Sequence, residues 1–432
     1  MFKILTNAWK VKDIRKKLFV VLILVTVFRI GSVIPLPGIN LVAWQFARSG
    51  YTNQSLFATI AGGGLGTIFA MGIGPYITSS IIMQLLTVAI PKLEQLKNEG
   101  EEGRKKINQY TRFVAVGLSL LQGGGTIYTL NSMGLFTHPN WLTYIMATTG
   151  LVAGTIFVMW LAELLSERGI GNGSSFIIFA NILSGVPSGL MMAYNQVMGL
   201  NSILTIPLTS VVGTVVKILI AVILLTLFIA LMTLAILVQD GERRIPVQYS
   251  KKMVGRQMYG GQSTYMPIKV NIAGVMAIIF AISIMQFPMT IAGFWPNEAL
   301  TRVNQVLALT HPVGAIIYMI LIICFTFFYT SFAVNPVEMA ENMKKNGGFI
   351  PGIRPGKPTS DYIQRTVTRL STIGSGFYVF LAMIPIVFQW IFGVQVGFGG
   401  TTLLIVTGVA LEIVKQLESQ LLMRHYKGFL DN

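Results

Sequence analysis

The stretch TIAGGGLGTIFAMGIGPY, residues 59–76, leads into a strongly apolar segment, yet its own composition suits a membrane-spanning helix poorly. Inside a helix, glycine costs about 1 kcal/mol relative to alanine, and proline costs about 3 kcal/mol. Three consecutive glycines and a nearby proline therefore predict a loose, mobile piece that feeds a regular helix. What this piece does depends on the rest of the chain.

The composition of the chain is that of a protein embedded in lipid. Hydrophobic residues make up 53% of the 432 residues and charged residues only 11%, and the mean hydropathy is +0.67, far from soluble-protein averages. The chain has a single cysteine, Cys324, which excludes an intrachain disulfide, and this residue lies in an apolar run. The basic start of the chain is not followed by a cleavage site, so we expect residues 1–17 to be retained as an amphipathic segment on the cytoplasmic membrane surface.

Ten apolar runs are long enough to cross a hydrocarbon core about 30 Å thick, which requires about 20 residues. They centre on residues 18–35, 68–90, 113–130, 141–165, 173–193, 212–238, 270–291, 313–333, 370–392 and 400–422. Of the 32 lysines and arginines, Arg48 and Arg302 fall in predicted external segments, and Arg29 and Lys217 fall within spans. Because basic residues mark the cytoplasmic side, we predict an all-α polytopic membrane protein with ten transmembrane helices and both termini in the cytoplasm.

Ten spans divide into two halves of five. Because five is odd, the halves would be inverted relative to each other, which places a functional pathway at their interface. The expected units are an N-terminal half at 18–200, a C-terminal half at 201–422 and a cytoplasmic tail at 423–432. No clear sequence repeat accompanies this division, so the inversion rests on the count alone.

The ionisable residues show no pattern of metal, cofactor or catalytic chemistry. The three histidines sit at span ends without metal-ligand spacing, and the aspartates lie in loops or tails. We therefore expect no metal, no cofactor and no enzymatic activity. Glu163 and Glu412 lie toward the cytoplasmic ends of their spans, and pairing with nearby basic residues is favoured over a role in ion coupling. Arg29, near the outer end of the first span, is expected to extend toward lipid headgroups.

Two predicted cytoplasmic loops, residues 239–269 and 335–370, are long and basic. Attraction to anionic lipid, worth about 1 kcal/mol per basic residue, explains the charge but requires no particular shape. The run GGFIPGIRPGKP, residues 347–358, combines three prolines with four glycines and would display Arg354 on a constrained turn. Docking of a large partner with an acidic or phosphate surface is an equally supported interpretation.

Ile77 and Ile81 share one face of the second predicted span because they are four residues apart. Ile77 is fourteen residues from Pro91, which at about 1.5 Å per residue places it roughly 20 Å into the membrane. Packing against lipid or another helix is the ordinary role for such residues. A dewetted constriction that shuts a pore is the functional alternative.

Several long motifs follow one another along the chain on the predicted sides of the membrane. They are FRIGSVIPLPGI (28–39), GIGPYITSSIIMQLL (72–86), EGEEGRKKINQYTR (99–112), ERGIGNGSSFIIFANI (167–182), GERRIPVQYSKK (241–252), NPVEMAENMKKNGGFIPGIRPG (335–356) and FGGTTLLIVTGVALEIVKQLES (398–419). Together they resemble the bacterial branch of the SecY family of protein-conducting channels over essentially the whole chain. A ten-span small-solute transporter with inverted repeats and a membrane scaffold for a cytoplasmic complex are the alternatives.

The resemblance implies two five-helix halves around an hourglass pore, with a seam that opens sideways into lipid. Unfolded secretory proteins would pass outward, and apolar segments would leave through the seam. Gln122 resembles the polar residue of the lateral gate, and an ordinary hydrogen bond between helices is an equally good interpretation. Residues 56–72 resemble the plug of the closed channel, which would include Ile60, Gly62, Gly63, Gly64, Leu65, Gly66, Ile68 and Phe69. Without the resemblance, close approach of neighbouring helices at these glycines explains the stretch equally well. The positions similar to the family's pore ring are Ile77, Ile81, Ile178, Ile279 and Ile405.

The resemblance also implies partners and a location. The residues matching the docking surface for a motor or ribosome are Arg243, Arg244, Lys251, Lys252, Arg256 and Arg354, the first two and the last at basic loop tips. The implied partners are the SecE and SecG subunits, the SecA motor, the ribosome with its RNA, an unfolded polypeptide and anionic lipids. The implied location is the bacterial plasma membrane.

Two positions depart from the family pattern. Ala277 stands where the family usually carries proline, so the seventh span is expected to bend less. Ser174 stands where an isoleucine is expected near the ring, which leaves Ile178 as the contribution of the fifth span.

Overall fold

The computed structural model describes residues 9–44, 64, 66–198, 211–249, 252–254, 257–259, 263–292, 298–309, 311–392 and 400–430. Each predicted span overlaps one long helix. These helices are α2 (Lys12–Gly31), α5 (Gly74–Ala89), α7 (Glu101–Ser132), α8 (Trp141–Arg168), α9 (Gly173–Met198), α10 (Val211–Asp240), α11 (Met276–Ala292), α13 (Pro312–Ala333), α15 (Lys357–Phe392) and α16 (Gly400–Leu430). The predicted helical fold class is confirmed.

Not every one of these helices is, over its described residues, long and apolar enough by length and composition alone to cross a membrane. Within the described ranges, four helices are long and apolar enough to span a bilayer, and a fifth qualifies if α5 and the following helix count as one bent span. The apolar parts of α9, α10 and α11 that are described are shorter. The number of ten spans therefore stays a prediction.

The second predicted span begins later than its apolar run. Residues 66–73 form turns, and α5 starts only at Gly74, with Pro75 in its first turn, where a missing N–H costs nothing. The helix ends at Ala89 because Ile90 precedes Pro91 and adopts an extended conformation. The next helix, α6 (Pro91–Asn98), lies at 102° to α5. The glycine-rich stretch thus does lead into a regular helix, as expected.

The two segments predicted as cytoplasmic loops contain regular structure. The first contains β1 (Glu242–Tyr249), β2 (Lys252–Val254), β3 (Gln257–Tyr259) and β4 (Ser263–Lys269), and the second contains α14 (Pro336–Lys345), β5 (Gly348–Phe349) and the start of α15. The strands pair antiparallel in the order β4-β1-β5, and β2 pairs with β3. Alternating Ile245 and Val247 of β1 face a small apolar core shared with Met343, Ile350 and Ile363. This separate core holds the basic segments in a defined shape.

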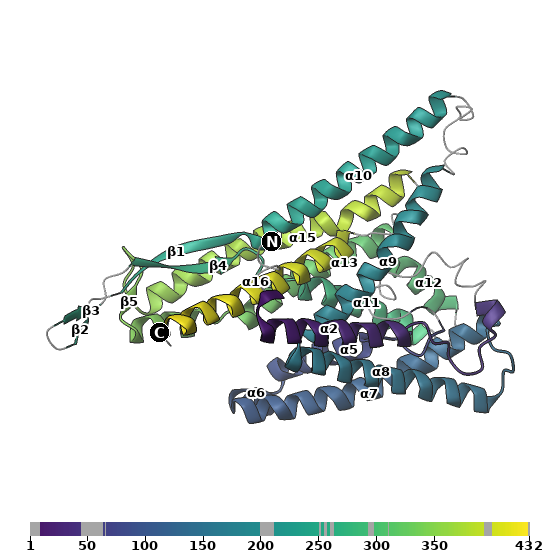
Figure 1. Ribbon diagram of the computed structural model, residues 1–432, viewed down its shortest axis with the longest axis horizontal. Helices are drawn as coiled ribbons and strands as arrows, with labels where there is room; N and C mark the ends of the chain where they lie inside the picture. The colour runs from purple at the N-terminus through teal and green to yellow at the C-terminus, as the bar shows by residue number, and fades with distance from the viewer. Residues whose placement is uncertain are drawn as a thin grey trace.

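The main core lies where the helices of both predicted halves meet. It joins buried residues of α2, α5, α8 and α9 to those of α11, α13, α15 and α16. In Figure 1, α2, α5, α7 and α8 form the lower layer, α10, α13, α15 and α16 form the upper one, and α9 passes between them. The sheet and α6 lie at one end of the molecule, and a short helix, α12 (Glu298–Leu307), lies at the other. Segments predicted as cytoplasmic therefore lie together at one end and a segment predicted as external lies at the other, and which end faces the cytoplasm stays a prediction.

Candidate functional site

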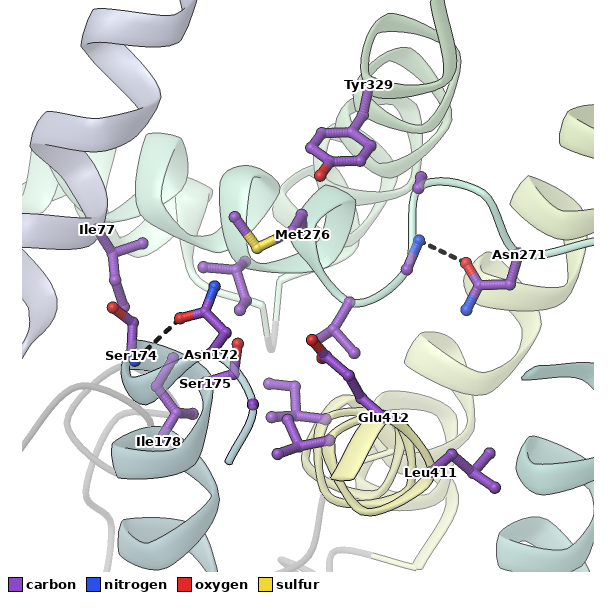
Figure 2. Close-up of a pocket in the computed structure, with 18 of the residues that line it drawn as sticks. Ile77, Asn172, Ser174, Ser175, Ile178, Asn271, Met276, Tyr329, Leu411 and Glu412 are labelled. Atoms are coloured by element: carbon purple, nitrogen blue, oxygen red, sulfur yellow. Dashed lines mark hydrogen bonds between the residues drawn. The ribbon is translucent and has the colours of Figure 1, made fainter. Parts of the chain in front are cut away.

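A cavity of about 870 Å³ opens among the helices at the end where the sheet lies. Its wall is built by residues of α5, α8, α9, α10, α11, α13 and α16, together with the segment between β4 and α11. The cavity therefore lies between the predicted halves rather than inside one of them. Figure 2 shows side chains from α9, α11, α13 and α16 directed toward the shared space.

Apolar side chains form one part of this wall. Ile77, Ile178, Ile279 and Ile405 line the cavity, and each comes from a different helix. All four belong to the same buried core, with exposed fractions between 0% and 8%. Ile81 belongs to that core but does not line the cavity. Four of the five residues assigned to a ring thus converge on one space, and their role in sealing it stays a prediction.

Polar side chains also line the wall. The Gln239 carboxamide donates to the Leu404 carbonyl at 3.0 Å and to the Thr407 hydroxyl at 3.1 Å, which ties α10 to α16. Ser174, one of the two departures from the family pattern, also lines the cavity. The second departure, Ala277, is fully buried in α11. Gln239 was not recognised from the sequence, because a lone polar residue at the end of an apolar run gives no specific signal.

Two ion pairs involve charged residues of the cavity wall. Arg112 Nε of α7 donates to Glu163 Oε1 at 2.6 Å, so the expected pairing of Glu163 with a base is confirmed. Lys415 Nζ lies 2.6 Å from Asp240 Oδ1. Glu412 lines the cavity and makes no ion pair within the part of the chain that the structure describes, so the pairing expected for this residue is wrong.

Arg29 also differs from expectation. Its Nη1 lies 3.4 Å from the Oδ1 of Asn181, a buried residue of α9. The guanidinium therefore binds a protein side chain of the neighbouring helix, and lipid headgroups alone do not account for its position.

The stretch assigned to the plug is described in part. Ile60, Gly62, Gly63 and Leu65 lie outside the described residues, whereas Gly64, Gly66, Ile68 and Phe69 lie within them.

Phe69 is buried between aromatic rings of two helices. Its ring is 6.0 Å from that of Phe28 in α2 and 5.8 Å from that of Phe157 in α8, stacked against both. Two glycines allow Ile68 and Phe69 to lie this close to α2 and α8. A Cβ atom at Gly31 would overlap the Phe69 ring, and one at Gly154 would overlap the Ile68 carbonyl. The described end of the stretch is thus held by close packing against α2 and α8.

We expect Gly154→Ala to loosen this packing. The added methyl group meets backbone rather than a flexible side chain, and overpacking of this kind costs about 1–3 kcal/mol. Gly117→Ala on α7 is the matched control, because a Cβ atom there meets nothing within 4 Å and alanine improves helix propensity by about 1 kcal/mol. Thermal unfolding of the purified protein in detergent should show a lower Tm for Gly154→Ala than for Gly117→Ala. Equal Tm values would contradict the tight contact.

The residues assigned to partner docking occupy different places. Arg243 and Arg244 are exposed at the start of β1, opposite Ile268 and Pro267 of β4. They lie at the base of the hairpin, beside the end of α10, so the expected position at a loop tip is wrong for both. Hydrogen bonding along β1 starts immediately after the helix and fixes these arginines there. Lys252 begins β2, and Lys251 and Arg256 lie outside the described residues.

Arg354 does lie at an exposed turn. Ile350 on one side of the turn and Thr359 on the other are buried, and the Thr359 hydroxyl donates to the Arg354 carbonyl at 2.8 Å. Gly352 and Gly356 have φ angles of 81° and 107°, which residues with a Cβ atom rarely adopt. The constrained turn predicted from the prolines and glycines is confirmed, and its function in docking stays a prediction.

The predicted halves also touch on the side where α11 contacts α5 and α7. Gln122, assigned to the lateral gate, is a half-buried residue of α7.

Between α6 and α13, the Lys97 ammonium lies 3.6 Å from the centroid of the Phe332 ring. Burial and the charge of Arg104 lower the pKa of Lys97, and Glu94 opposes them. This cation–π contact was not recognised from the sequence, because nothing in either segment indicates the other.

We expect Lys97 and Phe332 to be energetically coupled by about 0.5–2 kcal/mol, the range of cation–π contacts. A double-mutant cycle with Lys97→Gln and Phe332→Leu, followed by thermal unfolding, measures this coupling. Lys92→Gln, an exposed lysine on the same helix α6, should combine additively with Phe332→Leu. Additive effects in both cycles would show that the Lys97 contact does not stabilise the protein.

No group of three or more histidine, cysteine, aspartate or glutamate side chains that could hold a metal occurs among the described residues. The site is instead a large cavity between the predicted halves, lined by both apolar and polar side chains. This combination defines a membrane channel or carrier with a path between its halves.

Comparisons with known proteins identify the family. The family model described as SecY matches residues 67–414, and the protein translocase subunit SecY of Halalkalibacterium halodurans is 44% identical, with all of both chains covered. A solved structure of a protein-conducting channel matches with a TM-score of 0.63 at 20% identity, covering 94% of this chain and 92% of that one. Sec61 in a canine ribosome-channel complex matches with a TM-score of 0.59 at 18% identity, covering 94% and 92%. The chain belongs to the SecY family.

Proposed function

We propose that this chain is the channel-forming subunit of a bacterial protein translocase. Unfolded secretory polypeptides pass through the cavity and across the membrane, and apolar segments leave sideways between α5, α7 and α11. The observation that carries the proposal is the convergence of Ile77, Ile178, Ile279 and Ile405 from four helices at one end of the cavity. An apolar constriction of this kind excludes water when empty and closes around a chain of any sequence, because it requires no specific hydrogen bonds.

The energy and the remaining subunits come from partners. The sequence has no phosphate-binding glycine loop followed by lysine and serine or threonine, which favours an external source of energy. The resemblance to the SecY family supports the SecA motor, the ribosome with its RNA and the SecE and SecG subunits in these roles. The match to Sec61 in a ribosome-channel complex supports ribosome binding. Basic residues beside the sheet favour binding to ribosomal RNA or anionic lipid. The concentration of lysine and arginine in alternate connecting segments supports both termini in the cytoplasm, and the resemblance to the bacterial branch of the family supports the plasma membrane.

Photocrosslinking tests the proposal directly. A photoreactive amino acid at Ile77 should capture a secretory polypeptide stalled during export, because Ile77 lines the cavity. The same group at Met83, a buried residue of α5 that does not line the cavity, should capture little. A small-solute transporter or a scaffold would give no adduct at either position. Capture at neither position, or equal capture at both, would contradict a polypeptide path through this cavity.

A further inference from the structure

Glu412 places a carboxylate on the wall of the cavity, between its mouth and the isoleucines. It lies seven residues after Ile405 on α16, which is two helical turns or about 10 Å. Gly408 and Val409 lie between them and line the same cavity, so this face of α16 is continuous from the constriction to Glu412. Figure 2 shows the Glu412 side chain directed from α16 into the space that Tyr329 and Met276 also face.

The neighbouring charges leave this carboxylate without a partner. Glu163, the other acidic residue of the wall, is neutralised by Arg112 at 2.6 Å. Lys415 is three residues from Glu412 and would be its natural helical partner, but Asp240 of α10 holds it at 2.6 Å. Lys269 lines the cavity from β4 and makes no ion pair with Glu412. Within the described ranges, Glu412 is therefore the wall carboxylate that remains free to bind a cation.

The surroundings make such a site selective. The chain has a formal net charge of +16, and exposed basic residues of the sheet, such as Arg243 and Arg244 of β1, lie at the end where the cavity opens. A carboxylate inside a cleft with low-dielectric walls focuses the local field and attracts positive charge. A cationic group that enters the cavity thus meets, at Glu412, a carboxylate that makes no ion pair within the described residues.

We propose that Glu412 binds the ammonium or guanidinium group of a lysine or arginine in the entering polypeptide, within the basic segment that precedes the apolar part of a secretory signal. Signals carry positive charge immediately before the apolar run. An extended chain covers about 10 Å in about three residues, so a cation at Glu412 places the first apolar residues against Ile405. This inference rests on the proposed function and adds a residue that selects the substrate.

The test uses the complete channel complex in vesicles, supplied with its motor and two precursors. The precursors are identical except that the segment before the apolar run carries lysines in one and glutamines in the other. Glu412→Gln should slow export of the lysine precursor about two- to fivefold, the range of one partly exposed ion pair, and leave the glutamine precursor unchanged. Glu418→Gln is the control, because Glu418 is exposed on the same helix and does not line the cavity.

Charge reversal separates binding from a structural effect. Glu412→Lys should favour a precursor with glutamates before its apolar run over the lysine precursor, and Glu412→Asp should retain the normal preference. Equal slowing of the lysine and glutamine precursors by Glu412→Gln, or no preference reversal with Glu412→Lys, would overturn this inference and leave the proposed channel intact. Export of neither precursor by the parent complex would overturn the proposed function, and the inference with it.

Discussion

Replacing both Ile178 and Ile279 by serine is expected to turn the closed channel into an ion leak, whereas replacing Ile177 and Ile278 is not. Ile178 and Ile279 line the cavity from α9 and α11. Their chain neighbours Ile177 and Ile278 are equally buried but do not line it. Hydroxyl groups at the constriction give water a hydrogen-bonding path through a formerly dry site. Because each 1.4 kcal/mol removed from a barrier raises a rate about tenfold, we expect conductance to rise at least about tenfold.

The two double variants are matched in their cost to stability. Each loses two buried isoleucines, about 3–6 kcal/mol of apolar burial in total. Unfolding in detergent should therefore report similar losses for both pairs, and conductance in planar bilayers should separate them. Equal conductance of the two double variants would remove Ile178 and Ile279 from the seal, whatever the loss of stability.

Apolar length predicts where the helices lie but not where they end. The helix α7 begins at Glu101 although its apolar run was placed at 113–130, and α15 begins at Lys357 although its run was placed at 370–392. Glutamate, lysine, arginine and glutamine are good helix formers, so a helix continues into water wherever no proline or glycine stops it. The strands were missed for a related reason, since β1 and β4 are polar on one face and short.

Four of the five isoleucines assigned to the ring line one cavity, and the exception has a geometric reason. On α5, the residues that line the cavity are Tyr76, Ile77, Ser80 and Gln84, a stripe that follows intervals of three and four residues. Ile81 lies on the other side of this stripe and packs into the core. The sequence shows that Ile77 and Ile81 lie on the same broad face of the helix. How much of that face is open to the cavity depends on the packing of the neighbouring helices, which the sequence of α5 does not specify.

Charge pairing around the cavity could not be predicted for the same reason. The distance of Lys415 from Glu412 along the helix favours a local pair, yet Asp240 at the end of α10 binds the lysine instead. The partner is set by how α10 and α16 pack, which their apolar sequences do not specify. The constrained turn at Arg354 was predictable because its prolines and glycines act locally.

Arg354→Glu is expected to abolish motor-driven export while leaving the fold intact. The arginine is exposed, and the turn that displays it is held by buried Ile350 and by the hydrogen bond of Thr359 to the Arg354 carbonyl. Neither contact uses the guanidinium, so the free energy of unfolding should change by less than about 0.5 kcal/mol. Reversing a charge in a docked interface costs about 2–5 kcal/mol, which weakens partner binding at least about thirtyfold.

Arg302→Glu provides the control, since it makes the same change of charge at an exposed residue of α12, at the opposite end of the molecule. Export into vesicles and binding of the purified motor should both fail with Arg354→Glu and persist with Arg302→Glu. Unchanged export with Arg354→Glu would show that this turn does not carry the docking contact. Loss of the folded protein in detergent would show that the arginine supports the small core beneath the sheet. Because that core forms without the guanidinium, binding and folding are separable here, and a specific loss of binding is the result that the structure favours.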